Sequence, residues 1–231
     1  LYTGDFNPYG TITAGRAEPQ RCETLVIEAT YGKPEQVLPP RQRVLRDLQG
    51  WMLTVAANGG GIVGAYTLGK AQEVVAAANA AGLRPAVSDE VGEVCDIYVA
   101  YDVPLEYDRF AALSPEQRAA PGMLVTSSTA TSGRRPDAVV LELRQRGAHT
   151  ARVSGWCAFA PWALRGVDAG FPMSDHADFT GLLNFVEACA PQQVYTVHGA
   201  QSELAREIRK RLGIPAQALP DRGETTLEEF T

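Results

Sequence analysis

Residues 61–82 read GIVGAYTLGKAQEVVAAANAAG, and this stretch indicates the class of fold. GIVGAY is a short apolar run typical of a buried strand. KAQEVVAAANAAG is a helical segment that Gly82 ends. A strand followed directly by a helix is the repeating unit of α/β proteins.

The same alternation continues on both sides of this stretch. Helical spacing of apolar residues predicts a helix within 40–58, and a further pair of elements follows through 86–102. Ser114, followed by proline and by glutamine three residues on, marks a short helix. The remaining patterns predict strands at TLVIEA (24–29), DAVVLEL (137–143), TARVSGW (150–156) and QVYTVHG (193–199), and helices at GLLNFVEACA (181–190) and SELAREIRKRLG (202–213). The chain is therefore predicted to have an α/β fold.

Composition limits the class of partner. The 231 residues are 45% hydrophobic and carry a formal net charge of −6. This balance supports a real core and argues against a broad basic face for non-specific nucleic-acid binding. A local cationic groove, or a site whose metal ions supply the positive charge, stays open.

The four cysteines are far apart and form no C-x-x-C pair, which argues against a zinc knuckle and favours thiols in a reducing cytosol. No apolar run reaches the length of a membrane span and no signal-peptide pattern is present, so a cytoplasmic location without a membrane is predicted. Because the chain opens on Leu1 inside what reads as the end of a strand, we expect it to be a fragment.

Two acidic residues stand at strand ends. Asp5 follows Gly4 in YTGD, where it could ligate a metal or cap a turn. Glu28 ends the apolar run TLVIEA, where a carboxylate is costly unless it is paired. It could orient a histidine, or it could be an acid at a strand tip that faces solvent.

The segment PMSDHADF places His176 between Asp175 and Asp178. Such acids favour a protonated imidazole and fix its tautomer, so His176 could act as a general acid, contact a phosphate or ligate a metal. The alternative is a capping cluster, in which Ser174 and Asp175 precede a helix.

His198 closes the predicted strand QVYTVHG just before a helix, a position suited to a metal ligand or to a packed histidine. The third histidine, His149, is expected in a turn.

GAYTLGKA (64–71) matches the phosphate-loop pattern G-x-x-x-x-G-K between a strand and a helix. It lacks the final hydroxyl, because Ala71 stands where serine or threonine would hold Mg²⁺. A nucleotide-triphosphate site is therefore not expected, although Lys70 at a helix N-terminus could hold one phosphate of a nucleic-acid backbone.

Six motifs in order, YTGDF, IEATYG, LGKAQE, VSGW, MSDHADF and VYTVHG, resemble the C-terminal two-thirds of a β-CASP nuclease. These are metallo-β-lactamase-fold enzymes that cut RNA or DNA. Two branches are similar in detail: the archaeal exonucleases related to mRNA 3′-end processing factors, and the bacterial ligase-associated DNA exonucleases.

The resemblance implies a metallo-β-lactamase αββα sandwich with an inserted Rossmann-like β-CASP domain. Residues 1–32 and 171–231 would belong to the first domain, 33–170 would form the cap, and the substrate would bind between them. Asp5 would bridge two zinc ions and His198 would ligate one of them. His176 would contact the scissile phosphate and protonate the leaving oxygen, with Glu28 hydrogen-bonded to it.

The resemblance also implies a deficit. The family's upstream H-x-H-x-D-H motif and one further upstream histidine have no counterpart in this sequence. Asp5 and His198 alone cannot hold two zinc ions, so this chain by itself is expected to be inactive or to bind metal weakly.

The sequence thus predicts part of a zinc-dependent phosphodiesterase that cleaves RNA or single-stranded DNA. Candidate phosphate contacts are Lys70, Arg134, Arg135 and the backbone around Ser174 and Asp175, with a solvated loop as the alternative for the arginine pair. The competing hypothesis is a non-catalytic scaffold in an RNA-processing complex. Whether the chain forms a homodimer stays open.

Overall fold

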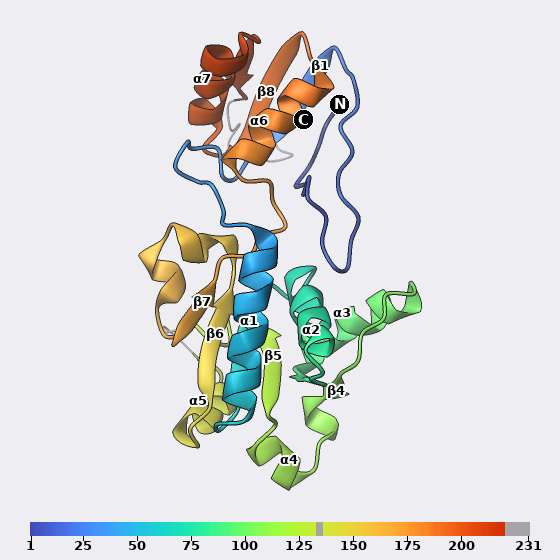
Figure 1. The fold of residues 1–231 in the computed structure, drawn as a ribbon, viewed down its shortest axis with the longest axis vertical. Coiled ribbons are helices and arrows are strands. Elements are labelled where there is room, and N and C mark those ends of the chain that lie inside the picture. The colour runs from blue at the N-terminus through green and yellow to red at the C-terminus, as the bar shows by residue number, and fades with distance from the viewer. Residues whose placement is uncertain (133–135, 220–231) are drawn as a thin grey trace, which may run out of the picture. The chain divides into compact units, whose positions relative to one another are not determined.

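The computed structural model describes residues 1–132 and 136–219, which divide into two compact units (Figure 1). The first unit contains Leu1–Gly10, Arg16–Val37 and the described residues from His176 onward. The second contains Thr11–Gly15 and Leu38–Asp175. Arg134 and Arg135 lie outside the described residues.

The second unit is built on a six-stranded sheet in the order β4-β3-β5-β2-β6-β7, with every neighbouring pair parallel. Its strands are β2 (Gly61–Ala65), β3 (Ala86–Val87), β4 (Asp108–Arg109), β5 (Met123–Ser127), β6 (His149–Val153) and β7 (Ala169–Phe171). Its helices are α1 (Arg41–Ala56), α2 (Lys70–Ala80), α3 (Asp89–Ala100), α4 (Pro115–Ala119) and α5 (Ala138–Gln145), with 3-10 turns at Phe110–Ala112, Gly155–Ala158 and Pro161–Leu164.

Helices cover both faces of this sheet. Because side chains alternate along a strand, Val63 of β2 points to one face and Ile62 to the other. Val63 packs in a core that α1 and α2 share, while Ile62 packs against Val140 and Leu143 of α5. This three-layer arrangement explains why β2 is buried along its whole length.

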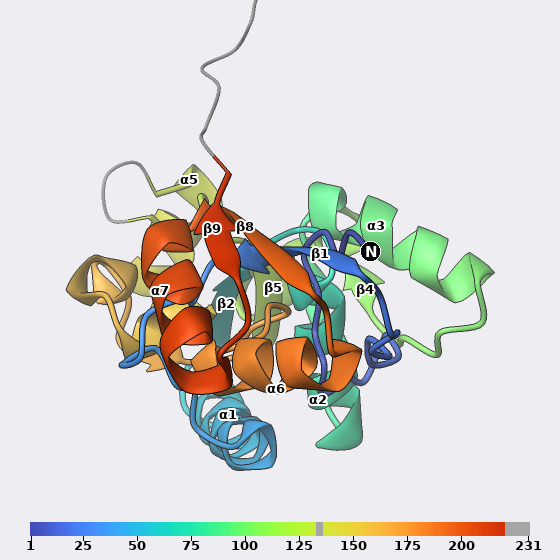
Figure 2. The same cartoon turned by 90° about the horizontal axis from the view of Figure 1, so that it is seen from above.

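The first unit has a three-stranded parallel sheet in the order β1-β8-β9. Its elements are β1 (Thr24–Ala29), α6 (Phe179–Cys189), β8 (Gln193–Gly199), α7 (Gln201–Leu212) and β9 (Ala216–Ala218). Figure 2 shows α6 and α7 on one side of the sheet, where Leu182 and Ile208 join the strand residues in one apolar core. Gly213 ends α7 in the left-handed conformation, with φ at 67°.

The structure confirms the predicted α/β class and most of its elements. TLVIEA and QVYTVHG form β1 and β8, and Ser114 accepts the amide of Gln117 to start α4. The stretch GIVGAYTLGKAQEVVAAANAAG forms β2 and α2, as predicted.

Two local predictions were wrong. DAVVLEL is helix α5 and not a strand, because the Asp137 side chain caps the amide of Val139 and the buried residues Val140 and Leu143 recur at helical spacing. His149 opens β6 and does not lie in a turn, since β6 pairs with β2 from Gly61↔His149 onward.

All four cysteines are free thiols. Among the helices of the described residues, none is both long and apolar enough to cross a bilayer.

Candidate active site

In the first unit, the imidazole of His176 lies against a buried carboxylate. Glu28 is fully buried near the end of β1, and its Oε2 lies 2.9 Å from Nδ1 of His176. The other carboxylate oxygen accepts the amide of Phe6 at 3.0 Å. Both oxygens of Glu28 are therefore paired, which is what allows a carboxylate to be buried at this position.

This contact sets what the imidazole can do. With Nδ1–H donating to Glu28, Nε2 is the ring nitrogen that can take up or release a proton. The His176 side chain is 30% exposed, so it is reachable from solvent. Thr30 Oγ1 lies 3.3 Å from the same Nδ1 and the ring of Tyr31 meets the imidazole edge-on, so the ring has neighbours that restrict its rotation.

Asp5 lies next to this pair. It follows Gly4, whose φ of +56° produces the turn that leads out of the initial segment. Its carboxylate is 70% exposed, and Oδ1 is 4.0 Å from Nδ1 of His176. Asp5, Glu28 and His176 form a group of three donors whose atoms lie within 4.8 Å of one another.

His198 lies across from the end of β1. Glu28 pairs with Val197 and Ala29 with Gly199, so a bulge leaves His198 between two registers of the ladder. His198 is exposed and has a φ of +57°, an uncommon conformation for a residue other than glycine. The end of the strand thus presents this imidazole outward.

The donors in the described ranges, 1–132 and 136–219, do not complete a zinc site. Tetrahedral zinc needs four ligands, or three and a water. The three-donor group contains Glu28 and His176, which are already hydrogen-bonded to each other, and His198 belongs to no group of three donors. Asp5 and His198 are both exposed and stay candidate metal donors.

The segment before His176 does not cap the next helix. Asp178 is the N-cap of α6, and its Oδ1 accepts the amide of Gly181 at 2.8 Å. The hydroxyl of Tyr9 donates to the same oxygen, and burial together with the Asp178 charge raises the pKa of Tyr9 to about 12. The capping alternative for Ser174 and Asp175 was therefore wrong, and both residues have partners in the second unit.

Lys70 is directed inward. In the second unit its side chain is 3% exposed, with Nζ 2.6 Å from Asp175 Oδ1 and 3.4 Å from Glu73 Oε2. Burial lowers the pKa of Lys70 to about 8, an effect that the Asp175 charge partly opposes. A phosphate contact through Lys70 would have to displace these carboxylates.

Sequence reasoning missed a cavity of about 590 Å³ in the second unit. It lies where β2, β5 and β6 end, because Tyr66, Ser128 and Ser154 each follow one of these strands and line it. Trp162 and Arg165 also line it and are exposed. The carboxyl ends of parallel strands are where open α/β sheets bind ligands, and this rule could have suggested the cavity from the order of elements.

Comparison with known proteins places these residues in a family. The model of the Zn-dependent metallo-hydrolase RNA specificity domain matches residues 170–220, a range that contains His176 and His198. An RNase J-like protein of Methanocaldococcus jannaschii is 33% identical over 78 residues, 32% of this chain and 18% of that protein. Transcription termination factor FttA of Methanothermobacter thermautotrophicus is 36% identical over 78 residues, 32% of this chain and 12% of that protein. The chain belongs to the β-CASP metallo-β-lactamase-fold family.

Other matches cover nearly the whole chain. A probable DNA ligase of Opitutus terrae is 31% identical over 230 residues, which are 98% of this chain and 22% of that protein. A solved structure of a protein of unknown function from Enterococcus faecalis has a TM-score of 0.50 at 14% identity and covers 96% of this chain and 56% of that one, a likeness of fold alone. This β-CASP chain thus spans less than a quarter of each of these three curated relatives.

Proposed function

We propose that this chain is part of a metal-dependent phosphodiesterase that cleaves RNA or single-stranded DNA, and that His176 is its proton donor. The observation that carries the proposal is the 2.9 Å contact between Nδ1 of His176 and the buried carboxylate of Glu28. The matched family description, which names a Zn-dependent metallo-hydrolase and RNA specificity, supports the same reaction class.

The proposed roles follow from the chemistry of the leaving group. When a phosphodiester breaks, the departing oxygen needs a proton near neutral pH, and an imidazole beside a carboxylate can supply it. Glu28 holds Nδ1–H and stabilises the imidazolium, so that Nε2–H is the proton given up. Glu28 is thus a positioning partner in this proposal, and His176 is the group that meets the substrate.

Asp5 and His198 are proposed as two ligands of a zinc site whose other ligands lie outside the described residues. Carboxylate oxygen and imidazole nitrogen are ordinary zinc donors. Both residues lie beside the carboxyl end of β1, which supports the assignment.

The RNA or DNA strand that is the substrate is proposed to contact the cavity of the second unit. Arg165 can meet a phosphate, and Tyr66 and Trp162 can stack on bases. Arg134, Arg135 and the backbone at Ser174 and Asp175 stay candidates for phosphate contacts. A cytoplasmic location and a homodimer also stay predictions.

The test uses the product of the complete gene. Zinc content is measured by mass spectrometry, and cleavage is measured on labelled single-stranded RNA and DNA. We expect bound zinc and cleavage, and we expect His176→Ala to lower the rate by about 10²–10⁴-fold while zinc content is retained. His149→Ala, at the opposite end of the second unit's sheet from its cavity, is the matched control and should cleave normally.

The second candidate function is a scaffold that binds strands without cutting them. The incomplete set of metal donors among the described residues favours it. If the complete gene product binds no zinc and cuts neither substrate, yet retains single strands in a gel-shift measurement, the scaffold function replaces the nuclease. If cleavage survives His176→Ala, only the proposed role of His176 as proton donor is overturned, and the proposed nuclease function stands.

A further inference from the structure

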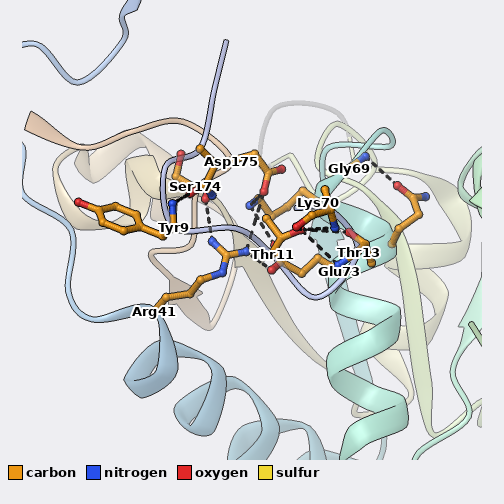
Figure 3. A network of polar contacts seen from close by, with 12 residues as sticks. Tyr9, Thr11, Thr13, Arg41, Gly69, Lys70, Glu73, Ser174 and Asp175 are labelled. Atoms are coloured by element: carbon orange, nitrogen blue, oxygen red, sulfur yellow. Dashed lines mark hydrogen bonds and ion pairs between the residues drawn. The ribbon is translucent and has the colours of Figure 1, made fainter. Parts of the chain in front are cut away.

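Four charged side chains form a network at the start of α2 in the second unit (Figure 3). Lys70 Nζ contacts Asp175 Oδ1 at 2.6 Å and Glu73 Oε2 at 3.4 Å. The guanidinium of Arg41 pairs with the other oxygen of Glu73 and donates to the carbonyl oxygen of Ser174 at 2.8 Å. The network therefore joins the first turns of α1 and α2 to residues 174 and 175.

Its charges are balanced and largely removed from water. Glu73 is 0% exposed and Lys70 is 3% exposed, whereas the Asp175 carboxylate is 38% exposed. A buried charge that loses its partner destabilises a protein far more than a lost surface pair does. The ion pair with the buried Lys70 ammonium therefore strongly favours a fixed position of the Asp175 side chain.

The backbone also fits closely around the Asp175 carboxylate. Gly69 has a φ of +81°, and a Cβ at this position would lie 3.2 Å from Oδ2 of Asp175. The amide of Gly69 is held by the side chain of Gln72 at 2.8 Å. The turn before α2 is therefore fixed in a conformation that leaves room for this one carboxylate.

Two successive residues are held in this way. Arg41 holds the Ser174 carbonyl and Lys70 holds the Asp175 side chain, while Met173 before them is buried in the core of the second unit. The next residue in the chain is His176. These contacts thus hold the chain of the second unit up to Asp175, whose peptide bond leads directly to His176.

We propose that Lys70 is a positioning residue for His176, because it fixes through Asp175 the peptide from which the imidazole projects. Lys70 acts on the backbone and does not touch the substrate, since its ammonium is turned inward and has two carboxylate partners. The catalytic consequence rests on the proposed function, whereas the structural consequence does not.

The first measurement is ¹⁵N NMR of the imidazoles in the folded chain. The sequence has three histidines, so each signal can be assigned from a single His→Gln variant. Lys70→Met should move and broaden the His176 Nδ1 signal and leave His149 unchanged, whereas Lys70→Arg should restore the wild-type spectrum. Arg84→Met removes an exposed, ion-paired cation of the same unit and should leave all three signals in place.

A second variant guards against a folding defect. Lys70→Met with Glu73→Gln removes one buried charge of each sign and still deprives Asp175 of the ammonium. It should move the His176 signal in the same direction as the single variant. A folded Lys70→Met or double variant with an unchanged His176 spectrum overturns the proposal.

The kinetic measurement uses the complete gene product. Lys70→Met should lower kcat by about 10–100-fold, because a small misplacement of a reacting group has effects of this size. KM should change less than kcat, because the Lys70 ammonium itself makes no substrate contact and only the phosphate contacts proposed for the backbone at Ser174 and Asp175 depend on it. A raised KM at constant kcat would instead show that Lys70 supports substrate binding alone, and would overturn the positioning role. If no variant of the gene product cleaves, the proposed function fails and the NMR result still decides this inference.

Discussion

Glu28 shows at the residue scale how a costly group is retained. Its carboxylate is fully buried, yet one oxygen accepts the Phe6 amide and the other meets His176. A buried acceptor that loses its donors, or donors that lose their acceptor, destabilise the fold by the desolvation of the unpaired group.

We therefore predict unequal effects for two substitutions of Glu28. Glu28→Ala leaves the Phe6 amide and the imidazole without their acceptor and should destabilise the first unit by about 1–3 kcal/mol. Glu28→Gln keeps an acceptor oxygen and should destabilise it less. Urea unfolding followed by circular dichroism checks this order, and equal losses would contradict it.

Lys70 gives a prediction about pH. Its pKa is lowered to about 8 in the folded protein, mainly by burial, so that between pH 8 and its ordinary value of 10.5 the unfolded chain binds more protons. Stability therefore gains a rising contribution from Lys70 as pH increases through this window. Below pH 8 both states are protonated and the contribution is constant.

The comparison with Lys70→Met isolates this contribution from other groups. The raised pKa of Tyr9 acts in the opposite direction over part of the alkaline range and is common to both proteins. The free energy of unfolding of the wild type, minus that of the variant, should rise from pH 8 to 10.5 and be flat from pH 6 to 7.5. A flat difference throughout would show that Lys70 keeps its ordinary pKa.

At the residue scale, the sequence indicates which side chains are unusual for their position, but it does not indicate which other side chains they contact. Glu28 and His176 could be singled out because an acid at a strand end and a histidine among acids are unusual. Lys70 was expected to face a phosphate, and nothing local indicates that its partner is Asp175, 105 residues away. Arg165 and Trp162 carried no signal, because their place beside the cavity depends on the order of strands.

At the element scale, β2 shows how closely the central sheet is packed. Gly64 lies in this strand, and a Cβ there would overlap the side chain of Thr131. Gly50 lies on the exposed side of α1, where a Cβ would meet nothing within 4 Å. The same Gly→Ala substitution can therefore be compared at a tightly packed strand position and at an exposed helix position.

We predict opposite signs for them. Gly64→Ala should destabilise the second unit by about 1–3 kcal/mol through overpacking. Gly50→Ala should stabilise it by about 0.5–1 kcal/mol, because alanine loses less backbone entropy in a helix. Thermal unfolding of both variants checks the signs, and a stabilised Gly64→Ala would show that Thr131 can move aside.

Elements with clear periodicity were predictable, and short apolar runs were not. The helix within 40–58 and the helix of 202–213 show apolar stripes that only a helix places on one face. DAVVLEL contains the uninterrupted apolar run AVVL, a pattern that suits a buried strand as well as a helix. The N-cap Asp137 distinguishes the two, because its side chain accepts the amide of Val139 and so favours the helix.

At the scale of the whole molecule, each unit has a core of its own. The core of the first unit includes Leu182, and its other residues come from β1, α6, β8, α7 and β9, from the segments next to them, and from the initial segment, which contributes Phe6. The cores of the second unit contain none of these residues. A substitution that removes core packing in one unit should therefore lower the stability of that unit and leave the stability of the other largely unchanged.

Leu182→Ala should cost about 2–5 kcal/mol, as large-to-small changes in a core do. Hydrogen exchange should accelerate at the amides of β1 and β8 and stay close to wild type in β2 and β5. Val63→Ala, in the second unit, should show the reverse pattern. Equal acceleration in both sheets after either substitution would mean that the two units unfold together.

The discontinuity of the first unit has a consequence for biosynthesis. β1 (Thr24–Ala29) pairs with β8 (Gln193–Gly199), and the chain between them includes the whole stretch Leu38–Asp175 of the second unit. A ribosome adds about 5–20 residues per second, so the apolar β1 waits on the order of ten seconds for its partner strand. During that wait its edge is open to aggregation or to a chaperone. The second unit can fold while the nascent chain is still attached, whereas the sheet beside His176 closes only after β8 and β9 have been synthesised.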